Sequence, residues 1–454
     1  MEYLLMLQHH LGLTVRGGHA IGRRHFLRGV AASGLAAGAL SWTDALAVSA
    51  ADMRQRGMAC ILLWMPGGPS QFETFDPKPN HENAGETGAI STNVPGTIFA
   101  DNLPHLARIA DQLAVVRSMS TKIGEHQLAS FLMHTAYVPS ATVRHPTLGS
   151  VVAKEIGDVA SQLPSFVRIG QGQNAGTGGL LGNEFDPLVM QSAQRPPENS
   201  KPTTESRRYQ SRLALLDRLE GTTDDGSLAS LAADHRKMYE QASQMVLSPE
   251  MEAFDLSREP EHVRKAYGIS GAPRDSRPPN PGGMRGPNPG DFAAGCLMAR
   301  RLVERGVTFV EVNLPNWDSH QDNFPAHRRL CEAMDLPTAA LIEDLRQRGM
   351  LDRTLVVWMG EFGRTPRVNP RGGRDHYPRA FNMVLAGAGI QVGQVYGETS
   401  PGGDEVVDSP VSEKDLFQTI YKCLGIDAAK EYMSPIGRPI RIVDGGSPVA
   451  GLLS

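Results

Sequence analysis

Short apolar runs recur along the chain, and each is followed by residues that favour turns. Runs that are almost unbroken by polar residues are typical of strands buried on both faces of a parallel sheet. Residues 291–305 and 330–349 instead have apolar positions at helical spacing, and each stretch is closed by a glycine. This alternation predicts an α/β fold with a doubly wound, mostly parallel sheet flanked by helices. The predicted strands cover residues 59–65, 113–117, 166–169, 307–314, 354–359 and 381–387.

The polar pattern predicts one large domain, residues 48–454, that follows a signal at residues 1–47. Residues 203–268 are highly charged and follow helical spacing, so we expect a helical insertion whose charged rows face solvent. Residues 271–290 are rich in Pro and Gly, a composition that predicts a loop.

The amino-terminal 47 residues have the features of a twin-arginine export signal. Arg23 and Arg24 precede a weakly apolar stretch of small residues, and Ala45-Leu46-Ala47 follows as an A-x-A cleavage site. The alternative, a cytosolic amphipathic helix, fits poorly because the stretch is rich in Gly and has no polar stripe. The expected location is therefore the periplasm, or another exported site reached by the twin-arginine pathway.

Composition narrows the classes of function. Of the 454 residues, 21% are charged and the formal net charge is −4, so no basic surplus indicates a nucleic-acid partner. No apolar tract reaches the length of a membrane span, and we expect no stable span once the signal is removed. The four cysteines lie far apart without a C-x-x-C pair, which argues against thiolate zinc and against a dense disulfide framework.

Four residues of metal-ligating types lie at the ends of the predicted strands of the carboxyl-terminal half. Asp318 and His320 come after one strand, Glu361 follows the next, and His376 precedes the third. Ligands of open α/β sheets sit beyond the carboxyl ends of the strands, so these side chains are expected to converge in one crevice. Mixed oxygen and nitrogen donors predict a divalent metal ion, without distinguishing zinc, calcium, magnesium or manganese. The alternative for Asp318 and His320 is an Asx turn beside a surface histidine.

Hydroxyl groups follow the second predicted strand. Ser118, Ser120 and Thr121 stand at its end, and His126 lies a few residues beyond. A hydroxyl near a histidine at a strand end is a candidate nucleophile with its base. The alternative is that a serine caps the next helix.

Three arginines are candidate binders of an anionic substrate. Arg364, Arg374 and Arg379 can each offer a guanidinium fork to a phosphate or sulfate. They can equally serve to neutralise Glu361 and Asp375, since a buried carboxylate needs a partner. Asp375 itself is either a metal ligand or an acceptor that orients a histidine.

Seven stretches spread over the mature chain resemble the bacterial family known as domain of unknown function 1501. That family is often grouped with the alkaline phosphatase and sulfatase superfamily, so the resemblance implies an alkaline phosphatase-like domain. The stretches are MPGGPSQFETFDPKP (65–79), VVRSMS (115–120), HPTLGS (145–150), ARRLVERGVTFVEV (299–312), WDSHQDN (317–323), GEFGRTP (360–366) and GRDHYP (373–378).

The resemblance also implies a site. Asp318 and His320 would stand where an Asp/His pair binds metal, Glu361 where the superfamily has the Asp of an Asp-His pair, and His376 at its last histidine. Two departures matter: Phe362 replaces the histidine of that pair, and no Cys/Ser-x-Pro-x-Arg sulfatase signature is present. They predict a single metal ion, or an inactive relic of a two-metal site, and argue against a formylglycine sulfatase.

Two hypotheses about function follow. The first is an exported, metal-dependent hydrolase of a small-molecule or glycan ester of phosphate, sulfate or a related anion. The second is a non-catalytic envelope binding protein that keeps the same fold. An open metal position beside an activated hydroxyl favours the first, and a closed, fully liganded site favours the second. The sequence predicts no particular oligomeric state.

Overall fold

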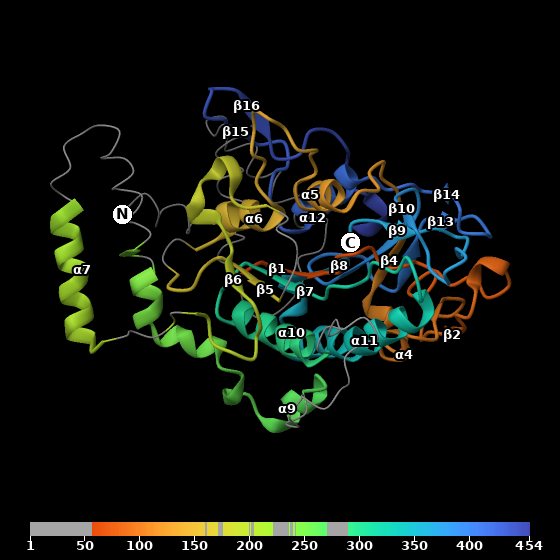
Figure 1. The fold of residues 1–454 in the computed structure, drawn as a ribbon, viewed down its shortest axis with the longest axis horizontal. Helices are drawn as coiled ribbons and strands as arrows, with labels where there is room; N and C mark the ends of the chain where they lie inside the picture. The colour runs from red at the N-terminus through yellow and green to blue at the C-terminus, as the bar shows by residue number, and fades with distance from the viewer. Residues whose placement is uncertain are drawn as a thin grey trace, which may run out of the picture. The chain divides into compact units, whose positions relative to one another are not determined.

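An eight-stranded sheet forms the centre of the computed structural model (Figure 1). Among the described strands of this sheet, all neighbours pair in parallel except the strand at Phe381–Ala386, which is antiparallel to both of its neighbours. The predicted doubly wound, mostly parallel α/β fold is confirmed. In spatial order the strands are β12 (Gln394–Tyr396), β4 (Ala114–Met119), β11 (Phe381–Ala386), β8 (Thr354–Met359), β1 (Ala59–Trp64), β7 (Phe309–Asn313), β5 (Phe166–Ile169) and β6 (Leu188–Met190).

The described residues all belong to one compact unit. The expected export signal at residues 1–47 lies outside them, as does most of the Pro/Gly-rich stretch at 271–290. Within residues 203–268, the described elements are α7 (Ser206–Glu220), two 3-10 helices, η5 (Pro249–Phe254) and η6 (Leu256–Arg258), and α9 (Glu261–Ala266). The structure describes residues 57–158, 161–170, 176–198, 200, 204–220, 236, 239–240, 242–269 and 289–454.

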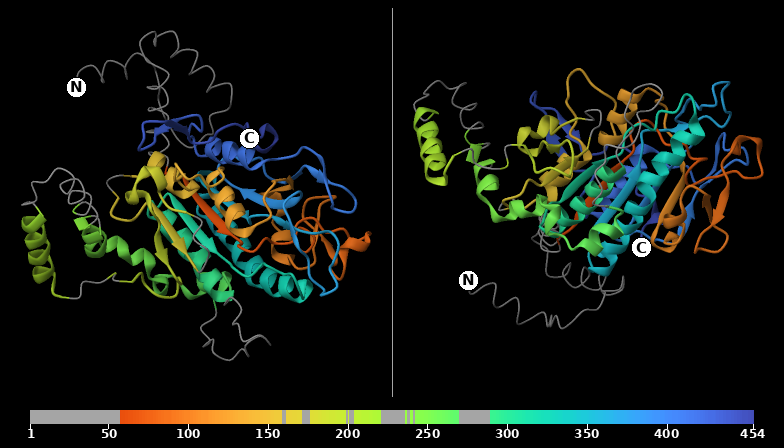
Figure 2. Two further views of the ribbon diagram at one scale, coloured as in Figure 1. Left: turned by 45° about the horizontal axis from the view of Figure 1, so that its top comes forward. Right: turned by 60° about the horizontal axis from the view of Figure 1, so that its bottom comes forward.

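Helices cover both faces of the sheet (Figures 1 and 2). Strand β1 shows why, because Ile61 and Leu63 face one apolar core while Leu62 and Trp64 face the other. Each such side chain contributes on the order of 1.5–3 kcal/mol when it is buried. One face packs on α4 (Pro104–Ala107), α10 (Pro289–Glu304) and α11 (Asn323–Gln347), and the other on α5 (His126–Thr135), α6 (Leu148–Ile156) and α12 (Glu413–Cys423).

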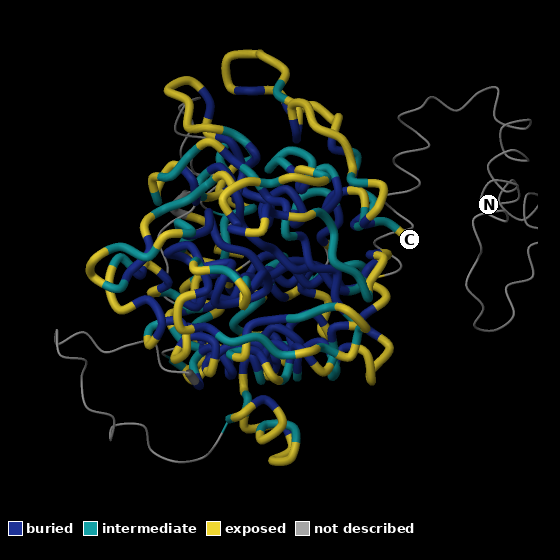
Figure 3. Tube along the Cα trace, turned by 90° about the vertical axis from the view of Figure 1, so that its right-hand side faces the viewer, coloured by how far each residue is buried: buried dark blue, intermediate teal, exposed yellow. Residues whose placement is uncertain are grey.

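Buried residues fill the centre of this unit, and exposed residues gather in the peripheral loops (Figure 3). Four smaller antiparallel pairs lie outside the central sheet. They are β2 (Ala89–Ser91) with β3 (Ile98–Ala100), β9 (Gly363–Arg364) with β10 (His376–Tyr377), β13 (Glu398–Thr399) with β14 (Val406–Asp408), and β15 (Glu431–Met433) with β16 (Pro439–Arg441).

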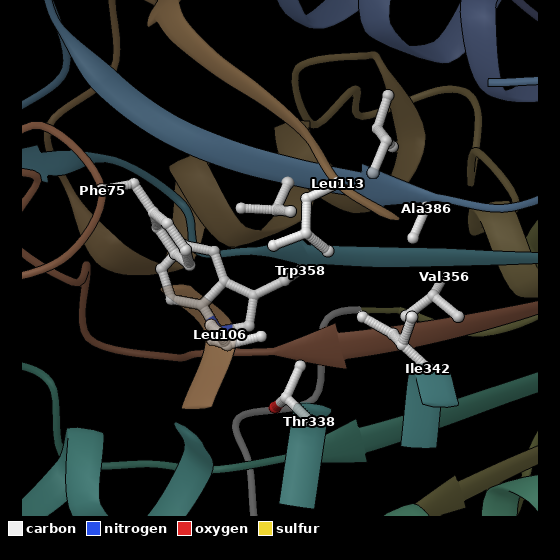
Figure 4. A pocket seen from close by; sticks show the side chains of 10 residues that line it. Phe75, Leu106, Leu113, Thr338, Ile342, Val356, Trp358 and Ala386 are labelled. Atoms are coloured by element: carbon white, nitrogen blue, oxygen red, sulfur yellow. The ribbon is translucent and has the colours of Figure 1, made fainter. Parts of the chain in front are cut away.

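A small apolar cavity lies in the core between β8, β11 and α11 (Figure 4). Its volume is about 10 Å³, and Thr338 is the polar residue among those that line it. That space holds one water molecule at most. The cavity is therefore a packing gap rather than a ligand pocket. Separately, none of the described helices combines the length and the apolar character that crossing a membrane requires.

The fold positions the candidate residues at one edge of the sheet. Strands β1, β4, β7 and β8 are parallel to one another, so their carboxyl ends meet at that edge. Strand β11 runs the other way and therefore begins at the same edge. The loops after four strands, and the loop before the fifth, are thus neighbours.

Candidate metal centre

Three histidines surround the carboxylate of Asp318. His126 Nε2 lies 3.3 Å from Asp318 Oδ2, and His320 Nε2 and His376 Nε2 lie 3.2 Å and 3.3 Å from Oδ1. Asp318 follows β7, His126 is the first residue of α5 after β4, and His376 stands in β10 just before β11. The ligand atoms of His126, Asp318 and His376 all lie within 4.8 Å of one another. Strand ends that are remote in sequence thus create one cluster.

The other ring nitrogen of each histidine is held by an acceptor. His126 Nδ1 is 2.7 Å from Glu361 Oε1, and His320 Nδ1 is 2.7 Å from Asp375 Oδ1. His376 Nδ1 is 2.7 Å from the carbonyl oxygen of Gly124. A carboxylate or carbonyl can only accept, so each Nδ1 carries a hydrogen, and each Nε2 is left facing Asp318, where it can carry a proton or bind a metal ion. Metal-ligating histidines are usually oriented in this way.

Two of these nitrogens face each other at close range. His320 Nε2 lies 2.9 Å from His376 Nε2. Two lone pairs at that distance repel unless a proton or a metal ion lies between them or beside both. The donor set therefore fits a divalent ion that accepts imidazole nitrogen and carboxylate oxygen.

The electrostatics of the cluster favour a cation. Hydrogen bonds to Asp318 and Glu361 raise the pKa of His126 to about 9. Burial alone would raise the pKa of Asp318, but hydrogen bonds from two of the histidines and from Arg364 hold it far below its usual range. Without a metal ion His126 thus keeps a proton at neutral pH, and an ion bound at Nε2 must displace it.

The cluster is open to solvent on one side. The side chains of His126 and His376 are 21% and 23% exposed, and those of His320 and Asp318 are 37% and 42% exposed. A structural metal site is normally closed by four protein ligands, whereas a catalytic one keeps a position open. The exposure here matches the open kind.

Glu361 lies behind His126. Its side chain is buried, and Oε1 accepts a 2.8 Å hydrogen bond from the Gly67 amide as well as facing His126 Nδ1. Its Oε2 is buried without a hydrogen-bond partner. A Cβ at Gly67 would stand 2.5 Å from the Asp318 amide nitrogen, so only glycine lets the loop after β1 approach the loop after β7 this closely. Glu361 is thus placed to orient His126.

The loops that carry His320 and His376 are joined to each other. The Arg374 amide donates to the Ser319 carbonyl at 2.9 Å, and the Asn369 side chain donates to the His320 carbonyl at 3.1 Å. A Cβ at Gly373 would stand 2.0 Å from the His320 carbonyl carbon, so the backbones meet directly. These bonds fix the spacing of the two histidines.

Two of the three candidate substrate arginines lie in the interior of the structure. Arg364 and Arg374 are both fully buried. Arg364 donates to Asp318 Oδ1 at 2.7 Å and to the Gly68 carbonyl at 2.9 Å, and Arg374 donates to Glu73 Oε1 at 3.0 Å. Their donors are thus committed to the protein rather than open to a substrate. Arg379 is exposed.

The three candidate hydroxyl groups do not join the hydrogen-bonded cluster of histidines around Asp318. Ser118 is buried and donates to the Ser409 carbonyl at 2.7 Å. Thr121 Oγ1 is buried without a partner, and Ser120 is partly exposed. Within the described part of the chain, none of these three hydroxyl groups hydrogen-bonds to His126 or to another histidine of the cluster.

Sequence reasoning missed the support beneath the cluster. The Gly124 carbonyl orients His376, but a backbone acceptor leaves no sequence signal. Glu73 and His327 are fully buried close to the loops that carry His320 and His376. The sequence around Glu73 predicts only a loop, and that around His327 only a helix. Only Asp375 was anticipated, as one of two alternatives, and the structure places it against His320.

Comparison with known proteins shows the family and little else. Residues 57–453 match the family described as "Protein of unknown function (DUF1501)". No curated protein matches the sequence.

Solved structures are similar at low identity. The lipoteichoic acid synthase LtaP from Listeria monocytogenes is 8% identical, with a TM-score of 0.37 over 82% of this chain and 73% of that one. The PsFucS1 sulfatase from Pseudoalteromonas sp. is 13% identical, with a TM-score of 0.35 over 84% of this chain and 72% of that one. Likenesses of this strength support no argument about what this chain does.

Proposed function

The chain belongs to the DUF1501 family, and we propose that it is a metal-dependent hydrolase of a phosphate, sulfate or related anionic ester. One observation carries the proposal: three histidines, each fixed through Nδ1, turn Nε2 toward one partly exposed carboxylate. A set of donors prepared in this way serves metal binding better than it serves folding, because solvent-exposed ion pairs contribute little stability.

The residues take separate roles in this proposal. His126, Asp318 and His376 hold the ion, and His320 is a further nitrogen donor beside them. Glu361 and the other acceptors orient the rings. A divalent ion supplies Lewis-acid polarisation of the ester group.

The chain also prepares the site for an anion. Arg364 pairs with Asp318 from the buried side and offsets part of its negative charge. A bound metal ion would therefore keep more of its positive charge for an anionic substrate than it would beside an unpaired carboxylate. Of the three candidate arginines, Arg379, exposed three residues after His376, is the one left to bind the charged group of the substrate. Hydrolysis then adds water to the ester and releases an alcohol and the free anion.

A second candidate, a non-catalytic envelope binding protein, is favoured by one observation. Among the described residues, none of the hydroxyls of Ser118, Ser120 and Thr121 hydrogen-bonds to a histidine of the cluster. A covalent nucleophile is therefore not prepared at this site as it is in enzymes with a Ser–His pair. The hydrolase proposal consequently relies on water as the attacking group.

Metal content and ester hydrolysis test the two candidates. We expect the purified, metal-loaded wild type to hold a stoichiometric divalent ion and to hydrolyse p-nitrophenyl phosphate or p-nitrophenyl sulfate. His376→Ala should weaken metal binding by about 100-fold or more, while His262→Ala, an exposed histidine on α9, should leave it unchanged.

The outcomes separate the candidates. A folded wild type that takes up no zinc, manganese, magnesium or calcium would refute the metal centre. Stoichiometric metal without hydrolysis of either ester would favour the binding protein instead.

A further inference from the structure

Glu73 is a fully buried carboxylate that the proposed reaction does not use. It lies in the loop after β1, and its Oε1 receives hydrogen bonds from Arg374 Nη2 at 3.0 Å, Arg374 Nε at 3.3 Å and Thr87 Oγ1 at 3.3 Å. Burial alone would raise the pKa of Glu73, but Arg374, His327 and the side chains of Ser70 and Asn323 together lower it. Glu73 is therefore an ionised carboxylate in the interior, and Arg374 is the residue that pairs with its charge.

Unpartnered polar atoms gather in the same interior region. Glu73 Oε2, Ser70 Oγ, Asn323 Nδ2 and Trp317 Nε1 all belong to fully buried residues, and none of these four atoms makes a hydrogen bond of good geometry. Ser70 and Asn323 nevertheless lie close enough to Glu73 to lower its pKa. Contacts connect them: the Ser70 amide donates to His327 Nε2 at 2.8 Å, and the His327 and Trp317 rings are 5.3 Å apart.

Such a region is costly to keep. A buried polar group without a partner costs on the order of 1–3 kcal/mol, and a well-packed apolar replacement is often more stable than a buried ion pair. Stability alone therefore does not account for these residues.

The region lies directly under the two loops that carry the metal ligands. Trp317 and Ser319 flank Asp318, and Ser319 Oγ donates to Asn323 Oδ1 at 2.7 Å. On the other loop, Arg374 stands two residues before His376 and donates its amide to the Ser319 carbonyl.

Arg374 also reaches beyond these loops. Its Nη2 donates to the Asn83 carbonyl at 2.7 Å, and its Nη1 donates to the Thr365 carbonyl at 3.1 Å and to the Pro366 carbonyl. A guanidinium with this many fixed partners has one orientation, and Glu73 supplies the charge that makes its burial tolerable.

We propose that Glu73 is a positioning residue: through Arg374 it holds loops 316–322 and 369–378 at the spacing that the histidine cluster needs. The consequence for metal binding rests on the proposed function. The effect of Glu73 on how rigidly the two loops are held is independent of the proposed function, and it can be measured on protein without metal.

Hydrogen exchange on the metal-free protein tests the proposal. In Glu73→Gln, which keeps the shape and removes the charge, we expect amides in both loops to exchange at least about tenfold faster than in the wild type. The matched control is Glu259→Gln, another buried acid, whose Oε2 lies 2.7 Å from Arg300 Nη2. It should leave exchange in both loops unchanged even if it lowers global stability.

A second variant keeps the proposal testable if Glu73→Gln does not fold. Arg374→Lys keeps a charge opposite Glu73 but loses the fork, and it should loosen the same two loops. In both variants the affinity of the protein for zinc should fall by about 10- to 100-fold.

The two proposals fail in different ways. Wild-type exchange in both loops of Glu73→Gln and Arg374→Lys would overturn the positioning role, whatever the metal data. A wild type that binds no metal would refute the proposed function, while the exchange comparison would still decide the role of Glu73.

Discussion

Glu311 shows how a single buried carboxylate ties stability to pH. It lies in β7 opposite Arg168 of β5, with Arg168 Nε 2.9 Å from Oε1 and His134 Nε2 3.8 Å from Oε2. Burial alone would raise its pKa, but Arg168 and His134 outweigh burial and lower the pKa to about 2. The folded state therefore holds Glu311 ionised at pH values where the unfolded chain is protonated.

The sign of the pH dependence follows. A depressed pKa contributes stability that is present above the unfolded value of about 4.3 and is lost as pH falls toward about 2. We expect Glu311→Gln to lower the free energy of unfolding at pH 7 by on the order of 3 kcal/mol, and by about half as much at pH 3. Urea unfolding at both pH values measures this difference. The exposed Glu332→Gln is the control, and a Glu311→Gln deficit that stays constant with pH would contradict the argument.

The arginines show what residue identity could not predict. Arg364 and Arg374 lie near carboxylates in the sequence, which leaves both a substrate role and a neutralising role open. Whether an arginine binds substrate or neutralises a carboxylate depends on whether it is buried. These two guanidiniums can be buried because backbone carbonyls, such as those of Gly68 and Asn83, accept their hydrogen bonds. Because every residue has a backbone carbonyl, the sequence does not show which carbonyls of distant loops accept these hydrogen bonds.

The elements were predictable where burial dominates. The apolar runs at 354–359 and 166–169 coincide with β8 and β5, because a strand buried on both faces has few polar positions to obscure it. The helix expected at 330–349 instead begins at Asn323. Its first turn contains Pro325, which a first turn tolerates, and Pro337 lies in its interior. The antiparallel direction of β11 also escaped prediction, because an apolar run carries no direction.

Helix α4 depends on a residue of another helix. Its own N-cap position, Leu103, provides no side-chain hydrogen bond. Asp335 of α11 does so instead, with Oδ2 accepting from the His105 amide at 2.7 Å and Oδ1 from the Leu106 amide at 2.8 Å. A carboxylate at a helix N-terminus satisfies free amides and interacts well with the helix dipole.

Removing this cap should destabilise the protein. We expect Asp335→Ala to lower the free energy of unfolding by about 1–2 kcal/mol, because one buried and one partly buried amide lose their acceptor. Denaturant unfolding measures the loss, and Glu332→Ala on the exposed side of α11 is the control. Equal stability of the two variants would show that the amides find other partners.

At the scale of the whole molecule, the sequence predicted which strand ends meet but not how their side chains face one another. Asp318, His320 and His376 were expected in one crevice because parallel strands share an edge, and the structure brings them together. His126 was expected only as a base. Its approach to Asp318 depends on where α5 begins relative to β7, which no local pattern specifies.

The location of the protein is a separate proposal that rests on residues outside the described structure. We propose that the protein is exported by the twin-arginine pathway, on the basis of Arg23-Arg24 and the Ala45-Leu46-Ala47 site. The pathway reads the arginine pair itself, so Arg23→Lys with Arg24→Lys should leave the uncleaved precursor in the cytoplasm, although the charge is unchanged. Cell fractionation with an antibody to the protein measures this, and Arg28→Lys is the matched control. Export of the double variant at the wild-type level would show that another signal directs the chain.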